Sequence, residues 1–94
     1  MRRETHIRSY FTLPTDLANE MRDWPEFVSG QDYSVDLQSR DSSETVRVRY
    51  VKDDEECYIS VSGDGTGTLF DRALGRALYA LSQHSDDLMV DRVA

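Results

Sequence analysis

The sequence predicts an α+β fold in which helices cover one face of an antiparallel sheet. Segments 33–38, 45–50 and 57–62 alternate apolar and polar residues, which is the pattern of strands with one buried face. Short polar connections separate them, as in an antiparallel meander. Segment 69–81 repeats apolar residues at three- and four-residue steps, the period of a helix that covers such a face. We therefore expect residues 1–94 to form a single domain in the order β-α-β-β-β-α, with a possible short final strand.

A strand and a short helix are predicted before the meander. Residues 6–12 alternate loosely, which predicts a strand at the edge of the sheet, and Pro14 ends it. Thr15 is then expected to cap a helix with one apolar face, formed by Leu17, Ala18 and Met21. Pro25 stops or kinks this helix, and its apolar surface is expected to continue for one more turn, up to Gly30. The apolar residues of that turn are Trp24, Phe27 and Val28.

The predicted core joins the apolar face of the meander to the apolar stripe of the long helix. Its expected members are Val35, Leu37, Val46, Val48, Ile59, Val61, Phe70, Leu74, Ala77 and Leu78. The other face of the meander is expected to contact solvent, because it carries Asp36, Arg47, Arg49 and Tyr58. Segment 88–93 is predicted to be a last short strand, with a helical turn as the alternative.

Three glycines precede the long helix and raise the question of a phosphate-binding loop. Backbone N–H groups at a helix N-terminus bind anions. The candidate anion-binding residues are Gly63, Gly65, Gly67 and Thr68. Their spacing matches neither a Walker loop nor a dinucleotide fingerprint, and Asp64 adds a carboxylate. Thr68 and Asp71 instead have the spacing of a capping box, so we interpret the loop as a corner between strand and helix.

The sequence contains no recognisable catalytic set. Cys57 lies on the apolar side of its predicted strand, so a catalytic pair with His6 or His84 is not expected. Adjacent carboxylates are typical of solvated turns, and no segment has the pattern of a calcium loop or the cysteine spacing of a zinc site. We therefore predict no enzymatic activity, no metal site and no cofactor.

The formal net charge of −7 results from 18 acidic and 11 basic residues. This excess disfavours binding to nucleic acids and to anionic membranes, because both repel an acidic surface. No apolar segment approaches the ~20 residues that span a bilayer, and the N-terminus lacks the apolar region of a secretory signal. The expected location is the cytoplasm, and the single cysteine excludes an internal disulfide.

These features predict a small acidic, non-enzymatic protein-interaction module whose partner is a protein with a basic surface. In architecture and charge, though in no motif, the predicted fold resembles acidic secretion chaperones and small immunity or inhibitor proteins. The alternative is a small-ligand-binding protein or enzyme that uses loop 63–68 for an anionic group. We also expect a weak homodimer through the long helix, with Tyr79 and Ala80 near the two-fold axis.

Overall fold

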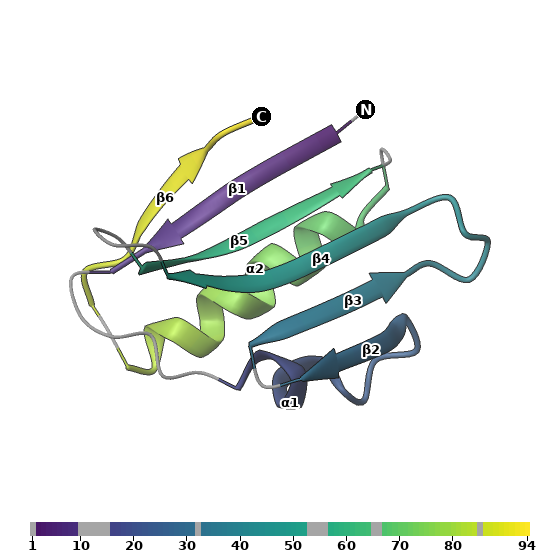
Figure 1. Cartoon of the computed structure of the whole chain (residues 1–94), viewed down its shortest axis with the longest axis horizontal. Helices are drawn as coiled ribbons and strands as arrows, with labels where there is room; N and C mark the ends of the chain where they lie inside the picture. Colours follow the sequence, from purple (N-terminus) through teal and green to yellow (C-terminus); the bar gives the residue numbers. More distant parts are fainter. Residues whose placement is uncertain (1, 10–15, 32, 53–56, 65–66, 85) are drawn as a thin grey trace.

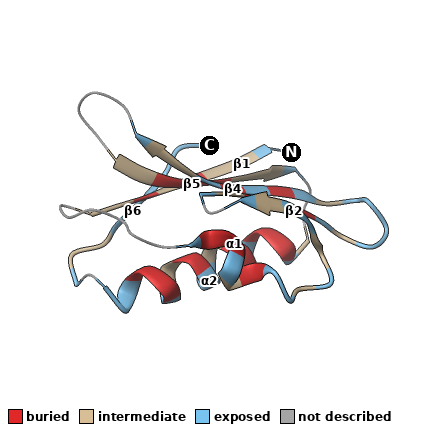
Figure 2. Cartoon of the chain, turned by 60° about the horizontal axis from the view of Figure 1, so that its bottom comes forward, coloured by how far each residue is buried: buried red, intermediate tan, exposed pale blue. Residues whose placement is uncertain are grey.

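The computed structural model describes residues 2–9, 16–31, 33–52, 57–64, 67–84 and 86–94. Within them, six strands form one antiparallel sheet, and two helices lie against one of its faces (Figures 1 and 2). In chain order the elements are β1 (Arg2–Arg8), α1 (Leu17–Met21), β2 (Phe27–Gln31), β3 (Ser34–Gln38), β4 (Thr45–Lys52), β5 (Cys57–Asp64), α2 (Leu69–Ser82) and β6 (Met89–Arg92). The predicted α+β class is confirmed, and the final segment is a strand.

The strands are arranged in the order β2-β3-β4-β5-β1-β6. The predicted meander is confirmed: β3, β4 and β5 pair consecutively and antiparallel. The first strand differs from the prediction in two ways. It begins at Arg2, and it lies between β5 and β6 instead of at the edge. Residues 10–12 of the predicted strand lie outside the described residues.

The core lies between the sheet and the two helices (Figure 2). Alternate residues of the inner strands point toward the helices, and the buried ones are Ile7, Val35, Leu37, Val46, Val48, Ile59 and Val61. The helices contribute Leu17, Ala18, Met21, Leu69, Phe70, Ala73, Ala77, Ala80 and Leu81. The predicted core is therefore confirmed, except that Leu74 and Leu78 are only partly buried. The helices stabilise the fold mainly by removing this apolar surface from water.

The prediction of a helical turn after Pro25 was wrong, because Phe27–Gln31 forms the edge strand β2. Its pairing with β3 shifts register between Phe27 and Ser29, and Val28 in this bulge is 59% exposed. A bulge breaks the two-residue alternation of a strand. The local sequence pattern therefore concealed this strand.

The short helix α1 is capped by Asp16, whose side chain accepts a hydrogen bond of 3.0 Å from the Asn19 N–H. The predicted cap, Thr15, lies outside the described residues. Ion pairs join α2 to the α1 region, between Arg72 and Glu26 at 3.2 Å and between Arg76 and Glu20 at 2.9 Å. Neither helix in the described part of the chain is long and apolar enough to cross a membrane.

Candidate functional site

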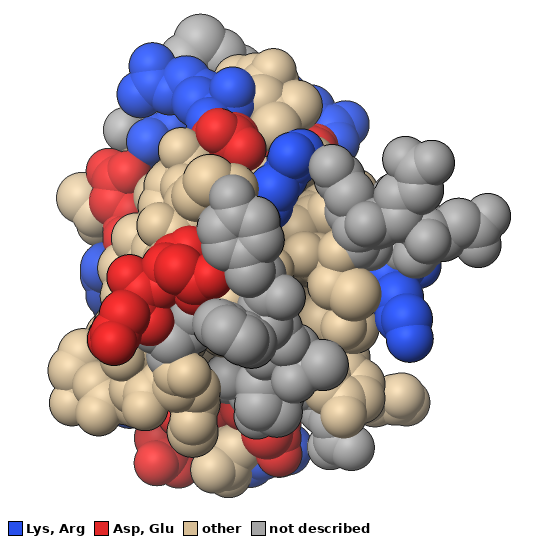
Figure 3. Space-filling view, turned by 90° about the vertical axis from the view of Figure 1, so that its left-hand side faces the viewer, with Lys and Arg blue, Asp and Glu red and all other residues tan. Residues whose placement is uncertain are grey.

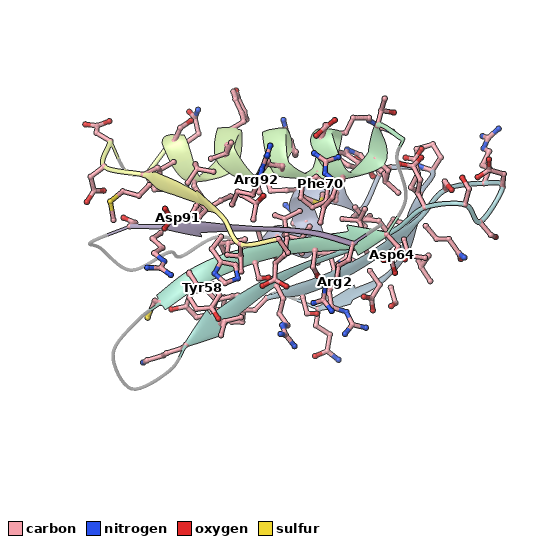
Figure 4. All side chains as sticks on the ribbon, turned by 90° about the horizontal axis from the view of Figure 1, so that it is seen from above. Arg2, Tyr58, Asp64, Phe70, Asp91 and Arg92 are labelled. Atoms are coloured by element: carbon pink, nitrogen blue, oxygen red, sulfur yellow. The ribbon has the colours of Figure 1, made fainter. Side chains whose placement is uncertain are left out.

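The face of the sheet opposite the helices, called the open face below, has a polar surface. Among the described residues no helix covers it (Figure 2). Strand alternation places four arginines and four carboxylates on it, namely Arg2, Arg8, Arg47, Arg49, Glu4, Asp36, Asp64 and Asp91. Figure 4 shows Arg2 and Tyr58 on the side of the sheet away from α2. The open face is therefore neutral overall, although the whole chain is acidic.

A compact cluster around His6 lies on the open face, where β1 pairs with β5. The Nε2 atom of His6 lies 2.7 Å from Oε2 of Glu4, and its ring stacks on Tyr58 with 4.3 Å between ring centroids. Arg2 donates a hydrogen bond of 2.9 Å to the other oxygen of Glu4. The hydrogen bond with His6, followed by the one from Arg2, lowers the pKa of Glu4 below its ordinary value. Glu4 is thus held as a carboxylate by its neighbours.

The His6 cluster has part of the geometry of a general base. A carboxylate orients a histidine ring, and Ser60 is the cross-strand partner of His6. However, Nδ1 of His6 is buried without a hydrogen-bond partner, and Ser60 is only 7% exposed. A nucleophile must lie within hydrogen-bond reach of its base and must be accessible to substrate. This arrangement therefore stabilises the open face and does not form a nucleophile–base pair.

Beside this cluster, the open face contains a shallow hollow of about 450 Å³. Its side chains include two arginines, two carboxylates and one exposed aliphatic group, contributed by Arg2, Arg47, Asp36, Asp64 and Val28. Arg47 donates a hydrogen bond of 2.7 Å from Nε to Asp36, and this bond raises the pKa of Arg47. Because its charges balance and are partly paired within the protein, the hollow shows no preference for a cation or an anion.

Three connections that are acidic in sequence leave from the same end of the sheet. The β2–β3, β4–β5 and α2–β6 connections all leave from the end at which β1 terminates. In sequence these connections contain seven acidic residues, namely Asp32, Asp53, Asp54, Glu55, Glu56, Asp86 and Asp87, of which the structure describes the last two. Figure 3 shows this end, with acidic side chains gathered on it and basic ones mainly toward its upper part. We call it the acidic end.

The predicted anion-binding loop is placed against a carboxylate of the protein itself. The Leu69 N–H, at the start of α2, donates a hydrogen bond of 2.9 Å to Oε1 of Glu44. A side chain at Gly67 would collide with the same carboxylate. An external anion at the start of α2 would therefore have to displace Glu44.

The other members of the predicted loop have separate roles. Gly63 belongs to β5 and lies so close to the backbone oxygen of Thr45 that an added Cβ would be 2.6 Å from it. Gly65 lies outside the described residues. Thr68 occupies the N-cap position without a side-chain hydrogen bond, and Asp71 instead pairs with Arg3 at 2.8 Å. The predicted capping box was wrong, because Glu44 supplies the capping oxygen from the preceding hairpin.

The structure places Cys57 and His6 on opposite faces of the sheet. Cys57 is on the helix-facing side of β5, whereas His6 is on the open face and His84 follows α2. Cys57 interacts with Tyr50, and this hydrogen bond raises the pKa of Tyr50. Within the described ranges, no group of three or more histidine, cysteine or carboxylate side chains could hold a metal ion.

Two surfaces bear on self-association. On α2, Tyr79 is 57% exposed, but Ala80 is only 4% exposed because it packs inside the monomer. The Ala80 side chain therefore offers little surface to a second copy, and the predicted dimer through α2 would depend mainly on Tyr79. At the edge of the sheet, Met89, Val90 and Val93 are about half exposed. This edge, and not α2, carries the larger group of exposed aliphatic side chains.

No protein-family model and no curated protein matches its sequence. The interpretation of its surfaces therefore depends on their geometry and chemistry alone.

Sequence reasoning missed the His6 cluster and the cap from Glu44. Glu4, His6 and Arg8 alternate along β1, which is a signal that they share one face. The signal was concealed because Thr5, on the other face, is polar although it is buried. No sequence pattern pointed to Glu44 as the cap of α2, because Glu44 and Leu69 are 25 residues apart in the chain.

Proposed function

We propose that this protein is a non-enzymatic interaction module that binds a basic protein surface through its acidic end, in a chaperone-, inhibitor- or immunity-like role. The observation that carries the proposal is the uneven distribution of charge. The open face is balanced, whereas the connections that leave from one end of the sheet contain seven acidic residues in their sequence, of which Asp86 and Asp87 are described. Opposite charges on two surfaces accelerate encounter and select the partner.

Other features support this assignment. The described residues contain a histidine held by a carboxylate but no hydrogen-bonded nucleophile beside it. The anion-binding alternative at loop 63–68 is disfavoured by the hydrogen bond from Leu69 to Glu44. A cytoplasmic location is part of the proposal, because a single cysteine leaves the fold without an internal disulfide, as is usual in reducing compartments.

A matched pair of charge variants tests the proposal. Glu55→Gln/Glu56→Gln removes two charges from the acidic end, and Asp23→Asn/Asp64→Asn removes two from elsewhere on the surface. The probe is a lysine- and arginine-rich peptide, with binding followed by fluorescence anisotropy. We expect the first variant to bind about tenfold more weakly, equivalent to about 1.4 kcal/mol, and the second to bind nearly as the wild type does.

Salt provides the second measurement. Binding at the acidic end should weaken steeply between about 0.05 M and about 0.5 M NaCl, because screening lengths fall below 10 Å over this range. Equal losses in both variants would show that the peptide senses only the total charge, which contradicts a defined site. Binding that is insensitive to salt would contradict an electrostatic partner.

A further inference from the structure

The last strand, β6, is an exposed edge of the sheet. All four of its residues are exposed, and its aliphatic side chains, together with Val93, are 45–53% exposed. The opposite edge, β2, is interrupted by a bulge, which is a feature that hinders edge-to-edge pairing. β6 has a regular register with β1 over all four residues. It is therefore the edge better suited to accept another strand.

The backbone of β6 directs a defined set of groups away from the sheet. Glu4 of β1 donates its N–H to Ala94 at 3.0 Å and accepts from the Val93 N–H at 2.9 Å. Residues two apart in a strand bond toward the same side, so the β1 residues that bond to β6 are Glu4, His6 and Arg8. The residues opposite the intervening positions, Val90 and Arg92, therefore turn their backbone N–H and C=O groups outward.

An apolar surface lies beside these outward groups. Asp71 of α2 pairs with Arg3 of β1, so this side of the helix faces β1 and β6. Helix periodicity places Leu74 and Leu78 on that side, and both are only partly buried. Val90 is opposite Ile7 and hence on the same side of the sheet, where Figure 4 also shows Arg92. A strand added to β6 would extend this apolar surface.

We propose that the strand added to β6 is the β6 of a second copy, related by a two-fold axis at Val90. The two sheets then join edge to edge, with Val90 opposite Val90 of the second copy. This pairing uses the outward backbone groups of Val90 and Arg92 as hydrogen-bonded positions. It requires no rearrangement of β1, because the groups that bond to β1 are different ones.

The charges of β6 favour this register over the registers centred on Asp91 and Arg92. With the axis at Val90, Arg92 lies opposite Leu88 of the other copy, and Asp91 lies opposite Met89. An axis at Asp91 would place two aspartates opposite each other, and an axis at Arg92 would place two arginines opposite each other, which is destabilising. β6 itself carries one acidic and one basic residue, so the contact is neutral although each chain has a net charge of −7.

Analytical ultracentrifugation over a range of protein concentrations tests the proposal. The wild type should show a monomer–dimer equilibrium, and Val90→Lys should remain monomeric throughout, because it places two ammonium groups on the axis. Tyr79→Lys is the control, since it adds the same charge to an exposed position on α2 and should dimerise as the wild type does. Both positions are about half exposed, so circular dichroism should show an unchanged fold in each.

Cross-linking provides an independent measurement of the register. In a Cys57→Ser background, Val90→Cys should give a covalent dimer with a short bis-maleimide, and Tyr79→Cys should not. A monomeric wild type at every concentration would overturn the proposal. A Val90→Lys variant that still dimerises would also overturn it. The same holds if Tyr79→Lys abolishes the dimer and Tyr79→Cys gives the cross-linked product. Neither measurement changes a residue of the acidic end. If the dimer is not found, the proposed binding of a basic protein can therefore still be tested with the charge variants.

Discussion

The two faces of the sheet are built from the same strands but are stabilised in different ways. On the helix-facing side, Val48 and Val61 are cross-strand partners, and both are 0% exposed within one continuous core. The residues that follow these valines in the chain, Arg49 and Ser62, lie on the open face and belong to a polar surface with balanced charges. Hydrophobic burial contributes far more free energy than exposed ion pairs do. The fold therefore depends on one face, and the other can change its chemistry while the fold persists.

The largest expected effect comes from a charge placed on the buried face. Val48→Asp should unfold the domain, because an unpaired buried carboxylate costs several kcal/mol against a total stability of about 5–15 kcal/mol. Arg49→Asp, one residue along the same strand, introduces the same side chain on the open face and should leave a folded protein. Circular dichroism and thermal melting distinguish the two. A stable Val48→Asp variant would show that the two faces do not differ in this way.

An intermediate effect is expected where a polar contact positions the helix layer. Gly67→Ala should push the Glu44 carboxylate away from the Leu69 N–H and cost about 1 kcal/mol, the usual value of a helix cap. Glu44→Ala should cost a similar amount. The double variant should be little worse than either single one, because both remove the same hydrogen bond. Additive losses in urea unfolding would show that Gly67 has another role.

The smallest effect is expected on the open face itself. Since the folded pKa of Glu4 is below its ordinary value of 4.5, its carboxylate stabilises the fold above that pH. This contribution is lost as the pH falls through the lowered pKa. Glu4→Gln should therefore cost less than about 1 kcal/mol at neutral pH and should flatten the pH dependence of stability in the acidic range.

Urea titrations of wild type and Glu4→Gln at several pH values measure this difference. Asp64→Asn, on the same face, is the control and should keep the acid-dependent step of the wild type. An unchanged pH profile in Glu4→Gln would mean that the hydrogen bonds of Glu4 to His6 and Arg2 do not contribute to folding. The open face would then be even less important for stability than the comparison implies.

Much of the fold could be predicted because its central elements have strong local periodicity. Val46 and Val48 alternate with Thr45 and Arg47, so β4 could be recognised without knowledge of its neighbours. β2 could not, because its bulge shifts the register between Phe27 and Ser29. The order of the strands could not be predicted from the sequence either, because β1 pairs with β5, which is more than half of the chain away.

The candidate sites were less predictable than the fold. The sequence identified the glycine loop, but the contact that explains Gly67 comes from Glu44 in a different hairpin. The stack of His6 on Tyr58 also joins two strands, β1 and β5, that are far apart in the sequence and adjacent in the sheet. Contacts between side chains far apart in the sequence leave no local pattern, because they depend on which strands become neighbours.

The fold class, the three central strands, the long helix and the acidic excess follow from the sequence alone. These properties depend on residue spacing and on composition, which the unfolded chain already has. The folded structure was needed to show that three acidic connections leave from the same end of the sheet, that the open face is neutral, that Ala80 is buried and that β6 is an edge strand. These properties depend on the strand order and on the side from which each connection leaves, and both are set when the apolar faces of sheet and helices are buried together.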